Sequence, residues 1–354
     1  MNELEQRIAA VVDPASGVAL SESAAEVRAE RAGEGLDVSV VLGYPLDAAA
    51  LGALEVAVAD VLDGAATRVS VRSRVGAHAP QPPLSPLPRV RNIIAIGSGK
   101  GGVGKSTTAV NLALALAADG AAVGVLDADV YGPSIPTMLG LSGKPESPDG
   151  KAIVPMRAHG VEAMSIGLLV EHDTPMIWRG PMATQALTQL LQQTLWGGDD
   201  ALDYLVVDLP PGTGDIQLTL SQKIPVAGAL VVTTPQEVAT MDARKALAMF
   251  GKVHVPVLGL VENMAVHVCS RCGHAEHVFG SGGAGRMAER YGVPLLGSLP
   301  LELAIREQGD LGLPVVAAAP DSSAARAYRA TARAMAARLA ARPGAPRSIA
   351  ASMV

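Results

Sequence analysis

The segment Gly97–Thr107, which reads GSGKGGVGKST, constrains the fold of this chain more than any other part of it. It contains the pattern G-x-x-x-x-G-K-S and lies between an apolar strand-like run at Asn92–Gly97 and a helical run at Lys105–Ala118. Glycines let consecutive backbone N–H groups turn toward phosphate oxygens, and the helix N-terminus adds a favourable partial charge. The segment therefore predicts a phosphate-binding loop in which Lys105 reaches the β- and γ-phosphates and Ser106 binds Mg²⁺.

Strand-like and helical runs alternate along the chain after this loop. Short runs rich in Val, Ile and Leu occur at Val123–Asp127, Tyr204–Asp208, Ala229–Thr233, Val257–Val261 and Leu295–Leu299. Such runs, separated by helices, indicate parallel strands buried on both faces. We expect an α/β fold: a P-loop NTPase with a mostly parallel sheet covered by helices on both faces, preceded by a small α+β domain. The last predicted helix is Ser322–Arg342. We expect one face of this helix to be exposed to solvent and to carry Arg326, Arg329, Arg333 and Arg338.

A proline-rich segment divides the chain. Residues 76–89 read GAHAPQPPLSPLPR, and such a segment cannot continue a helix or a sheet. We expect a small α+β domain over 1–76, an extended, semi-rigid linker over 77–90, a P-loop ATPase domain over 91–342 and a flexible tail over 343–354. In the front piece, apolar periodicity predicts helices at Leu4–Val12 and Asp47–Leu62 and strands at Leu36–Leu42 and Thr67–Val75.

The amino-acid composition argues against some classes of binding partner. The net charge is −6, and 49% of residues are hydrophobic, 18% charged and 3% aromatic. Such a globular chain lacks the basic face that grips nucleic-acid backbones and the aromatic platforms that stack single strands. The N-terminus has no signal-peptide pattern, no run approaches a membrane span, and two cysteines cannot form a disulfide framework. We therefore expect a soluble cytoplasmic protein with neither nucleic acid nor membrane as partner.

The two cysteines lie at C-x-x-C spacing, as Cys269 and Cys272. One chain thus offers two thiolates, half of what a tetrahedral sulfur site or an iron–sulfur cluster usually takes, whereas two chains related by a two-fold axis offer four. Two other interpretations stay open. His267, His274 and His277 are near enough in sequence to complete a zinc site within one chain, and the pair could also be a redox dithiol.

The phosphate-binding loop carries a second lysine, Lys100, directly after its first motif glycine. This form of the loop resembles the deviant Walker A loop of the family that includes MinD, ParA and the nitrogenase iron protein. The resemblance implies that Lys100 crosses a dimer interface to the partner's nucleotide, where its charge would act like an arginine finger. The sequence alone also permits a solvated loop lysine.

Polar residues at predicted strand ends resemble further motifs of that family. Asp208 precedes LPPGTGD and resembles the Walker B carboxylate that holds the Mg²⁺ shell. By the same resemblance Asp129 positions or activates the attacking water and Asp127 lies nearer the metal, with capping of the strand end as the alternative for both. Asn263, in VENM, resembles the adenine-recognising asparagine of this class, with the loop around Pro300 covering the ring.

The resemblance and the motifs together give a predicted site. Its catalytic residues are Lys100, Lys105 and Asp129, and its metal-binding residues are Cys269, Cys272 and, for Mg²⁺, Ser106. The predicted nucleotide-binding residues are Gly99, Lys100, Gly101, Gly102, Val103, Gly104, Lys105, Ser106, Thr107, Asp127, Asp208 and Asn263.

SGKGGVGKST, DADVYGPSIP, WRGPM, VVDLPPGTGD and VENM, followed by C-x-x-C, occur in this order between about residues 90 and 340. They resemble the Mrp/ApbC family of P-loop iron–sulfur cluster carriers. The resemblance implies a homodimer that holds a 4Fe–4S cluster between Cys269 and Cys272 of both subunits, binds and slowly hydrolyses ATP with Mg²⁺, and delivers the cluster to apo iron–sulfur proteins. The front piece, with Asp13-Pro14, resembles a small iron–sulfur assembly domain but has no cysteine, which favours partner docking over a thiol-based role.

Two alternatives differ in function. A partitioning or positioning ATPase resembling ParA or MinD would use a basic surface or a C-terminal amphipathic helix, and neither the net charge of −6 nor the sequence of residues 345–354 supports one. A zinc-stabilised P-loop ATPase without a cluster is the other alternative. It would be colourless, whereas a protein with an iron–sulfur cluster would be brown.

Overall fold

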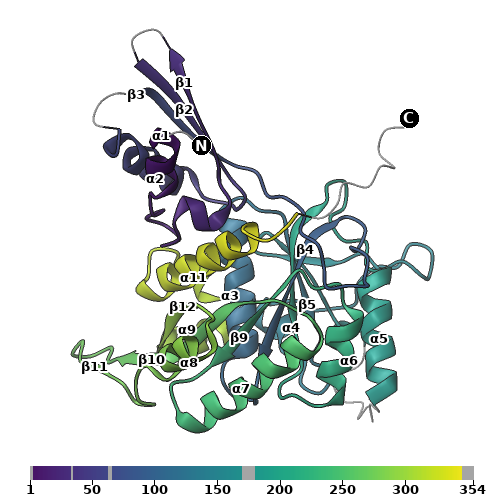
Figure 1. Cartoon of the computed structure of the whole chain (residues 1–354). Helices are drawn as coiled ribbons and strands as arrows, with labels where there is room; N and C mark the ends of the chain where they lie inside the picture. Colours follow the sequence, from purple (N-terminus) through teal and green to yellow (C-terminus); the bar gives the residue numbers. More distant parts are fainter. Residues whose placement is uncertain (1–2, 33–34, 63–65, 170–179, 345–354) are drawn as a thin grey trace.

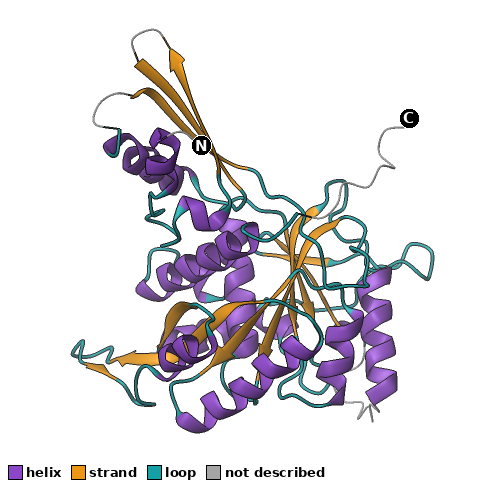
Figure 2. Ribbon diagram, in the orientation of Figure 1, coloured by secondary structure: helices purple, strands orange, loops and turns teal. Residues whose placement is uncertain are grey.

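The computed structural model describes residues 3–32, 35–62, 66–169 and 180–344 (Figures 1 and 2). A large α/β domain follows residue 90, and a smaller front domain with its own sheet, residues 3–73 where described, stands beside it (Figure 1). The tail predicted to be flexible lies outside the described residues from 345 onward, as do Trp178 and Arg179 of the WRGPM motif.

In the described part of the chain, the large domain is built on a nine-stranded sheet of order β11-β10-β9-β4-β8-β5-β7-β6, with β12 beside β10. The pairs from β10 to β7 are parallel, as is β10 with β12, while β6 and β11 pair antiparallel. The strands are β4 (Val90–Ser98), β5 (Val123–Asp127), β6 (Met156–Ala158), β7 (Val161–Ser165), β8 (Leu202–Asp208), β9 (Gly228–Thr233), β10 (Val257–Val268), β11 (Ala275–Glu276) and β12 (Leu295–Leu301).

Helices cover both faces of this sheet (Figure 2), which confirms the predicted α/β fold. One hydrophobic core lies under α3, α10 and α11, and the other lies under α5, α6, α7 and α8. The helical segments are α3 (Lys105–Ala118), α4 (Ile135–Met138), η2 (Ile166–Leu168), α5 (Gly180–Gln193), α6 (Asp215–Lys223), α7 (Glu237–Lys252), α8 (Gly283–Tyr291), α9 (Leu303–Asp310), α10 (Val315–Ala318) and α11 (Ser323–Ala340). None of the helices among the described residues combines the length and the apolar character needed to cross a membrane.

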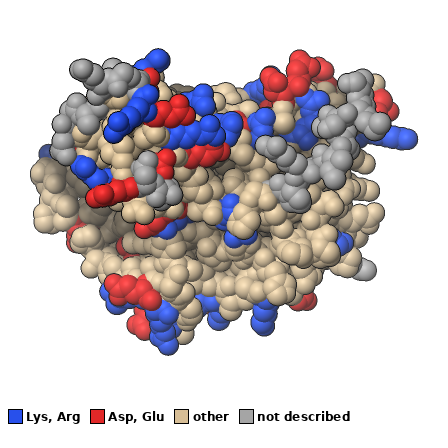
Figure 3. All heavy atoms as spheres, turned by 45° about the horizontal axis from the view of Figure 1, so that its top comes forward, with Lys and Arg blue, Asp and Glu red and all other residues tan. Residues whose placement is uncertain are grey.

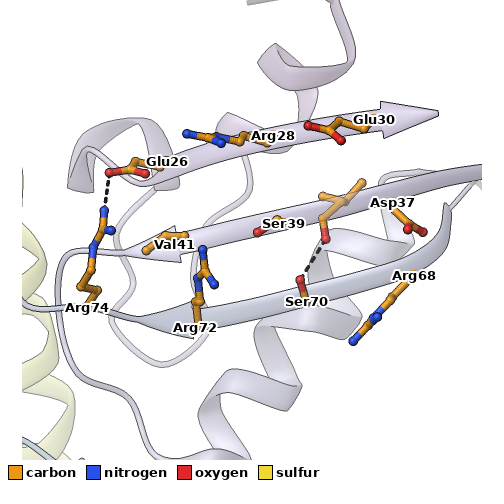
Figure 4. Close-up of a pocket in the computed structure, with 11 residues that line it drawn as sticks. Glu26, Arg28, Glu30, Asp37, Ser39, Val41, Arg68, Ser70, Arg72 and Arg74 are labelled. Atoms are coloured by element: carbon orange, nitrogen blue, oxygen red, sulfur yellow. Dashed lines mark hydrogen bonds and ion pairs between the residues drawn. The ribbon is translucent and has the colours of Figure 1, made fainter. Parts of the chain in front are cut away.

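The front domain contains a three-stranded sheet in which β1 and β2 are antiparallel and β2 and β3 are parallel. Its elements are α1 (Glu3–Ala9), η1 (Leu20–Ser23), β1 (Glu26–Ala32), β2 (Gly35–Leu42), α2 (Ala48–Asp60) and β3 (Ala66–Ser73). One face of the sheet packs on α2, because Val40 and Leu42 point to the same side and are buried with Leu54. The other face is a hollow lined mainly by arginines, carboxylates and serines (Figure 4). In the face seen in Figure 3, charges of both signs lie side by side in the upper part, whereas the centre is mostly uncharged.

The proline-rich segment, predicted to be an extended, semi-rigid linker, packs against the large domain. Gln81 is only 4% exposed. Its side-chain nitrogen donates to the backbone oxygens of Ser221 (2.7 Å) and Ile224 (2.9 Å), and its side-chain oxygen accepts from the N–H of Val226 (2.8 Å). These bonds fix the segment over the end of α6, because a buried amide with satisfied bonds is costly to expose.

Two arginines of α11 bind the buried carboxylate of Asp119, which corrects the expectation of a solvated arginine face. Arg333 donates to both side-chain oxygens of Asp119 at 2.7 Å, and Arg329 donates to Asp119 at 2.6 Å and also to Asp47. Asp119 is the C-cap of α3 and its side chain is fully buried, whereas Asp47 is the N-cap of α2 in the front domain. The helix α11 therefore joins the front domain to the far end of the phosphate-loop helix.

Replacing Arg333 tests this network. We expect Arg333→Met, which keeps an apolar side chain of similar length, to lower the free energy of unfolding by about 1–3 kcal/mol, because the buried Asp119 loses two of its bonds. Urea unfolding followed by circular dichroism measures the effect. Arg306→Met is the control, since its pair with Asp310 is exposed and should contribute less than about 0.5 kcal/mol. Equal effects in the two variants would contradict a structural role for the network.

Candidate functional site

The loop between β4 and α3 borders a cavity at the carboxyl end of the sheet. Because β4 lies between β8 and β9, the loop starts in the middle of the sheet. Gly102 and Gly104 have left-handed backbones, with φ of +78° and +80°, a conformation that other residues adopt only with strain. The cavity has a volume of about 220 Å³, and its lining residues include Lys100, Gly101, Gly102, Gly104, Lys105, Ser106, Thr107 and Asp129.

Two of the predicted loop residues do not line this cavity. Val103 is buried, with 2% of its surface exposed. Gly99 packs against α7 so closely that an added Cβ atom would lie 2.1 Å from the backbone carbon of Asp242. These two residues therefore support the shape of the loop, while their neighbours face the cavity.

Asp208, at the end of β8, binds both of the polar side chains that begin α3. Lys105 Nζ lies 2.6 Å from Asp208 Oδ1, and Ser106 Oγ donates to Oδ2 at 2.5 Å. The Lys105 side chain is 6% exposed and that of Asp208 is fully buried. Burial raises the pKa of Asp208, and the positive charge of Lys105 opposes that rise. A hydroxyl and a carboxylate side by side are oxygen ligands suited to Mg²⁺, so these residues fit a nucleotide bound with that ion.

Asp127 and Asp129 follow β5, the neighbour of β8, and have different surroundings. The Asp127 carboxylate accepts from the backbone N–H groups of Asp129 (3.1 Å), Ser134 (3.0 Å) and Ile135 (3.2 Å). Its burial, together with the negative charge of Asp208, raises the pKa of Asp127 to about 7. Asp127 therefore binds the backbone at the start of α4, as in the capping alternative. Asp129 is half-buried and lines the cavity.

Lys100 lines the same cavity as Lys105 and is half-buried. In the parts of the chain that the structure describes, no carboxylate pairs with its ammonium group, in contrast to Lys105. Ser134, Met138 and Pro211 also line the cavity, and sequence reasoning assigned them no role. Ser134 and Pro211 belong to the motifs DADVYGPSIP and LPPGTGD, so those motifs were the signal that could have found them.

A second cavity, of about 180 Å³, adjoins the first. The two share Gly104, Thr107 and Met138 as lining residues. Asn263 and Pro300 both line the second cavity, and Asn263 Nδ2 donates to the backbone oxygen of Val103 at 2.9 Å. The structure thus brings the two residues predicted for a base site to one cavity beside the phosphate-binding loop.

Cys269 and Cys272 lie in the turn between β10 and β11, at a corner of the molecule (Figure 1). The N–H of Cys269 donates to the oxygen of His274, and that of Gly273 donates to the oxygen of Cys269, each at 2.9 Å. Both thiols are free, with Cys269 half-buried and Cys272 exposed. Backbone N–H groups of Arg271 and Cys272 lower the pKa of Cys269.

The histidines near the turn do not complete a metal site with the thiols. His267 Nδ1 lies 2.9 Å from the backbone oxygen of Leu301, and His277 Nδ1 lies 2.6 Å from that of Ala265. Among the described residues, no group of three or more His, Cys, Asp or Glu side chains is placed to hold a metal ion. The geometry therefore gives no support to a zinc site made by one chain.

A lysine held at the carboxyl end of a parallel sheet by the aspartate of the adjacent strand is the arrangement of a P-loop NTPase. The ParA family, described as the NUBPL iron-transfer P-loop NTPase, matches residues 89–336. This chain belongs to that family, which confirms the resemblance seen in its motifs.

Proteins similar to this chain carry related names. The iron–sulfur cluster carrier protein of Pseudomonas fragi is 55% identical over 278 residues, which cover 78% of this chain and 96% of that protein. The iron–sulfur cluster carrier protein of Escherichia coli K12 is 61% identical over 251 residues, or 71% of this chain and 67% of that protein. A solved structure of the nucleotide-binding protein of Archaeoglobus fulgidus in complex with ADP has a TM-score of 0.56 and 38% identity, covering 63% of this chain and 87% of that one.

Gly104 offers a direct test of the loop geometry. A Cβ atom added there would lie 2.1 Å from Asn263 Nδ2, on a backbone that is already left-handed. We expect Gly104→Ala to weaken ATP binding about tenfold or more, because the loop and Asn263 must both move. Isothermal titration calorimetry measures the affinity. Gly285→Ala in α8 is the control, since no atom lies within 4 Å of the added Cβ. Equal ATP affinity in both variants would contradict the assignment of this loop.

Proposed function

We propose that this chain is a carrier of an iron–sulfur cluster that works as a homodimer and uses ATP. Its family is described as an iron-transfer P-loop NTPase, and two relatives that match most of it are named iron–sulfur cluster carrier proteins. One structural observation carries the proposal. The strand β10 holds Asn263 against the phosphate-binding loop and leads directly into the turn with Cys269. A nucleotide and a cluster would therefore be bound at two points along one strand.

The cargo requires more ligands than one chain supplies at this turn. An iron–sulfur cluster is usually held by four thiolates, and one chain offers Cys269 and Cys272. A second copy, related by a two-fold axis, would bring the same pair to the same point. Exposure of Cys272 at the end of a hairpin leaves room for that approach. In this proposal the cargo is a 4Fe–4S cluster that bridges two subunits.

The residues around the loop have distinct roles in this proposal. Lys105 exchanges its bond to Asp208 for the β- and γ-phosphates of ATP, and Ser106 and Asp208 then hold Mg²⁺. The bound ion neutralises phosphate charge. Asp129 orients the attacking water, because it lines the phosphate cavity and its carboxylate accepts from the backbone N–H of Tyr131 (3.3 Å) instead of from the start of α4. Lys100, unpaired within the described chain, reaches the nucleotide of the partner subunit.

The same strand offers a route by which the two sites affect each other. The register between β10 and β12 shifts between Glu262 and Val266, and Met264 within that stretch has a left-handed backbone with φ of +58°. A ligand that moves Asn263 would act on this bend and so on the orientation of the thiol turn. Nucleotide state would then change how firmly the dimer holds its cluster, and each ligand would affect the other's binding.

The acceptors in this proposal are apo iron–sulfur proteins, and the location is the cytoplasm. Both cysteines are free thiols in the structure, which suits a reducing compartment where thiolates are available as ligands. Neither nucleic acid nor a membrane is required for the transfer.

Cluster transfer to an acceptor tests the proposal as a whole. We expect Cys272→Ala to abolish transfer to an apo 4Fe–4S enzyme, because it removes half of the thiol ligands. Lys105→Ala should remove the ATP dependence of transfer, since the loop loses its phosphate-binding charge. The measurement is the activity regained by the acceptor. Lys245→Ala, on an exposed lysine of α7, serves as the control for loss of a positive charge. Unchanged transfer in both site variants would end the proposal.

Analysis of iron, sulfide and zinc after anaerobic purification tests the shared cluster separately. We expect about two iron and two sulfide per chain, with loss of both in Cys269→Ser. His274→Ala should retain them, because in a dimer with four thiolates no histidine is needed. About one zinc per chain, lost in His274→Ala, would favour the zinc-stabilised ATPase instead. A cluster-loaded protein that sediments only as a monomer would also contradict the bridging arrangement.

A further inference from the structure

The cavity next to the phosphate-binding loop contains a polar group with no partner. Tyr328, on α11, lines this cavity of about 180 Å³ and has no exposed surface. Its hydroxyl oxygen is buried and has no hydrogen-bond partner among the described residues. Buried hydroxyl groups are nearly always paired, because an unpaired one has lost its bonds to water without replacement. The unpaired hydroxyl therefore needs an explanation.

A second buried tyrosine, whose hydroxyl does have a partner, provides a comparison. Tyr44, in the front domain, is also without exposed surface, but its hydroxyl donates to Asp13 Oδ2 at 2.8 Å. The difference between the two residues is their position. Tyr44 is not among the residues that line the cavity, whereas Tyr328 is, so a ligand in the cavity can supply the missing partner once the side chains that cover the Tyr328 hydroxyl shift.

The surroundings keep Tyr328 in its neutral form. Burial, and secondarily the negative charge of Glu302, raise the pKa of Tyr328 well above its usual range. Glu302 lines the same cavity and accepts a hydrogen bond from Ser323 Oγ at 3.3 Å. A neutral phenol can donate to a ring nitrogen or a hydroxyl oxygen and can also accept.

The remaining walls have the chemistry of a nucleoside site. Ligand sites of this kind combine apolar surface with a few polar groups that fix orientation. Here the polar groups include Asn263, and the apolar surface comes from Met138, Met264, Pro300, Leu301 and Ile305. The adjoining cavity is bordered by the phosphate-binding loop, so a nucleotide whose phosphates lie in the loop can place its nucleoside here.

We propose that the hydroxyl of Tyr328 contributes to nucleotide binding by forming a hydrogen bond with the nucleoside of the bound nucleotide. The inference rests on the proposed function only in requiring that the loop bind a nucleotide, and it is independent of the cluster. Binding then gains the new bond and also removes the unfavourable unpaired state of the free protein. Tyr328 is thus a binding residue on α11, the helix that packs on α3. It lies outside all of the sequence motifs described above.

Tyr328→Phe tests the inference, because Phe keeps the buried ring and removes only the hydroxyl. We expect the affinity of the full-length protein for ATP, measured by calorimetry, to fall about fivefold to thirtyfold. The thermal midpoint of the nucleotide-free protein should stay the same or rise, since an unpaired buried group is gone. Inorganic triphosphate, which lacks a nucleoside, should bind the variant and the wild-type protein equally.

Tyr44→Phe is the matched control. It breaks the bond to Asp13, so the thermal midpoint should fall while the affinity for ATP stays unchanged. An unchanged ATP affinity in Tyr328→Phe, or an equal loss of affinity for inorganic triphosphate, would overturn the inference.

Deoxynucleotides locate the contact. If the effect of Tyr328→Phe disappears with 2′-deoxy-ATP or 3′-deoxy-ATP, the partner is that ribose hydroxyl; if it persists with both, the partner is the base. Either result supports the inference. The iron and sulfide content of Tyr328→Phe should equal that of the wild-type protein, so a failure here is distinguishable from a failure of the cluster-carrier proposal.

Discussion

The ion pair between Lys105 and Asp208 is the interaction on which the arrangement of the site depends. Two charges are stable in a protein interior only when each is closely paired and hydrogen-bonded, and here Ser106 supplies a further bond to the carboxylate. A parallel sheet makes this possible because the ends of β4 and β8 meet at one edge, so the helix after one strand starts beside the last residue of the other. In the proposed function, the aspartate and a phosphate of the nucleotide compete for the ammonium group of Lys105. When a ligand binds, Lys105 can therefore exchange the Asp208 carboxylate for a phosphate, so that its buried charge is never unpaired.

The helix α3 connects this pair to a second buried charge network. It runs from Lys105 to Ala118, with Asp119 as its C-cap, and its 14 residues span about 21 Å. Asp119 binds Arg329 and Arg333, which also bind Asp47 of the front domain. The front domain is thus attached through charged side chains to the helix that starts at the phosphate-binding loop, in addition to the proline-rich segment that Gln81 fixes. Its position relative to the loop is set by the packing of α11 on α3.

Local signals predicted much of the fold and of the site, and non-local contacts account for what they missed. The bounds of α3 and β5 agree with the sequence prediction, because each is an apolar run ended by polar or turn residues. The pattern did not predict β1, whose sequence EVRAERA is rich in charged and small residues and becomes a strand by pairing with β2. It also ended β10 at Val261, although the strand continues to Val268 through a mixture of polar and apolar residues that pair with β11 and β12.

The same distinction applies to side chains. The glycine loop and Asp208 both lie in recognisable sequence motifs, so the sequence could predict that they lie close together in the fold. The bonds from Arg333 to Asp47 and Asp119 join residues more than 200 positions apart, and no pattern around Arg333 identifies those partners. Tyr328 likewise lies in an alanine-rich helix, and only the folded chain brings it to a cavity.

The bend in β10 explains how one strand can serve two sites that need different surroundings. Asn263 is buried against the loop, with 5% of its surface exposed, whereas Cys269 is half-buried and Cys272 is exposed. Met264 adopts a left-handed backbone between them, which costs a residue with a side chain about 1–2 kcal/mol and persists only where the surrounding structure imposes it. Beyond this point the hairpin of β10 and β11 projects from the body of the molecule (Figure 1). The strain lies at the junction of the two sites, where a change of backbone conformation would alter the direction of the thiol turn while the buried half of the strand stays in the sheet.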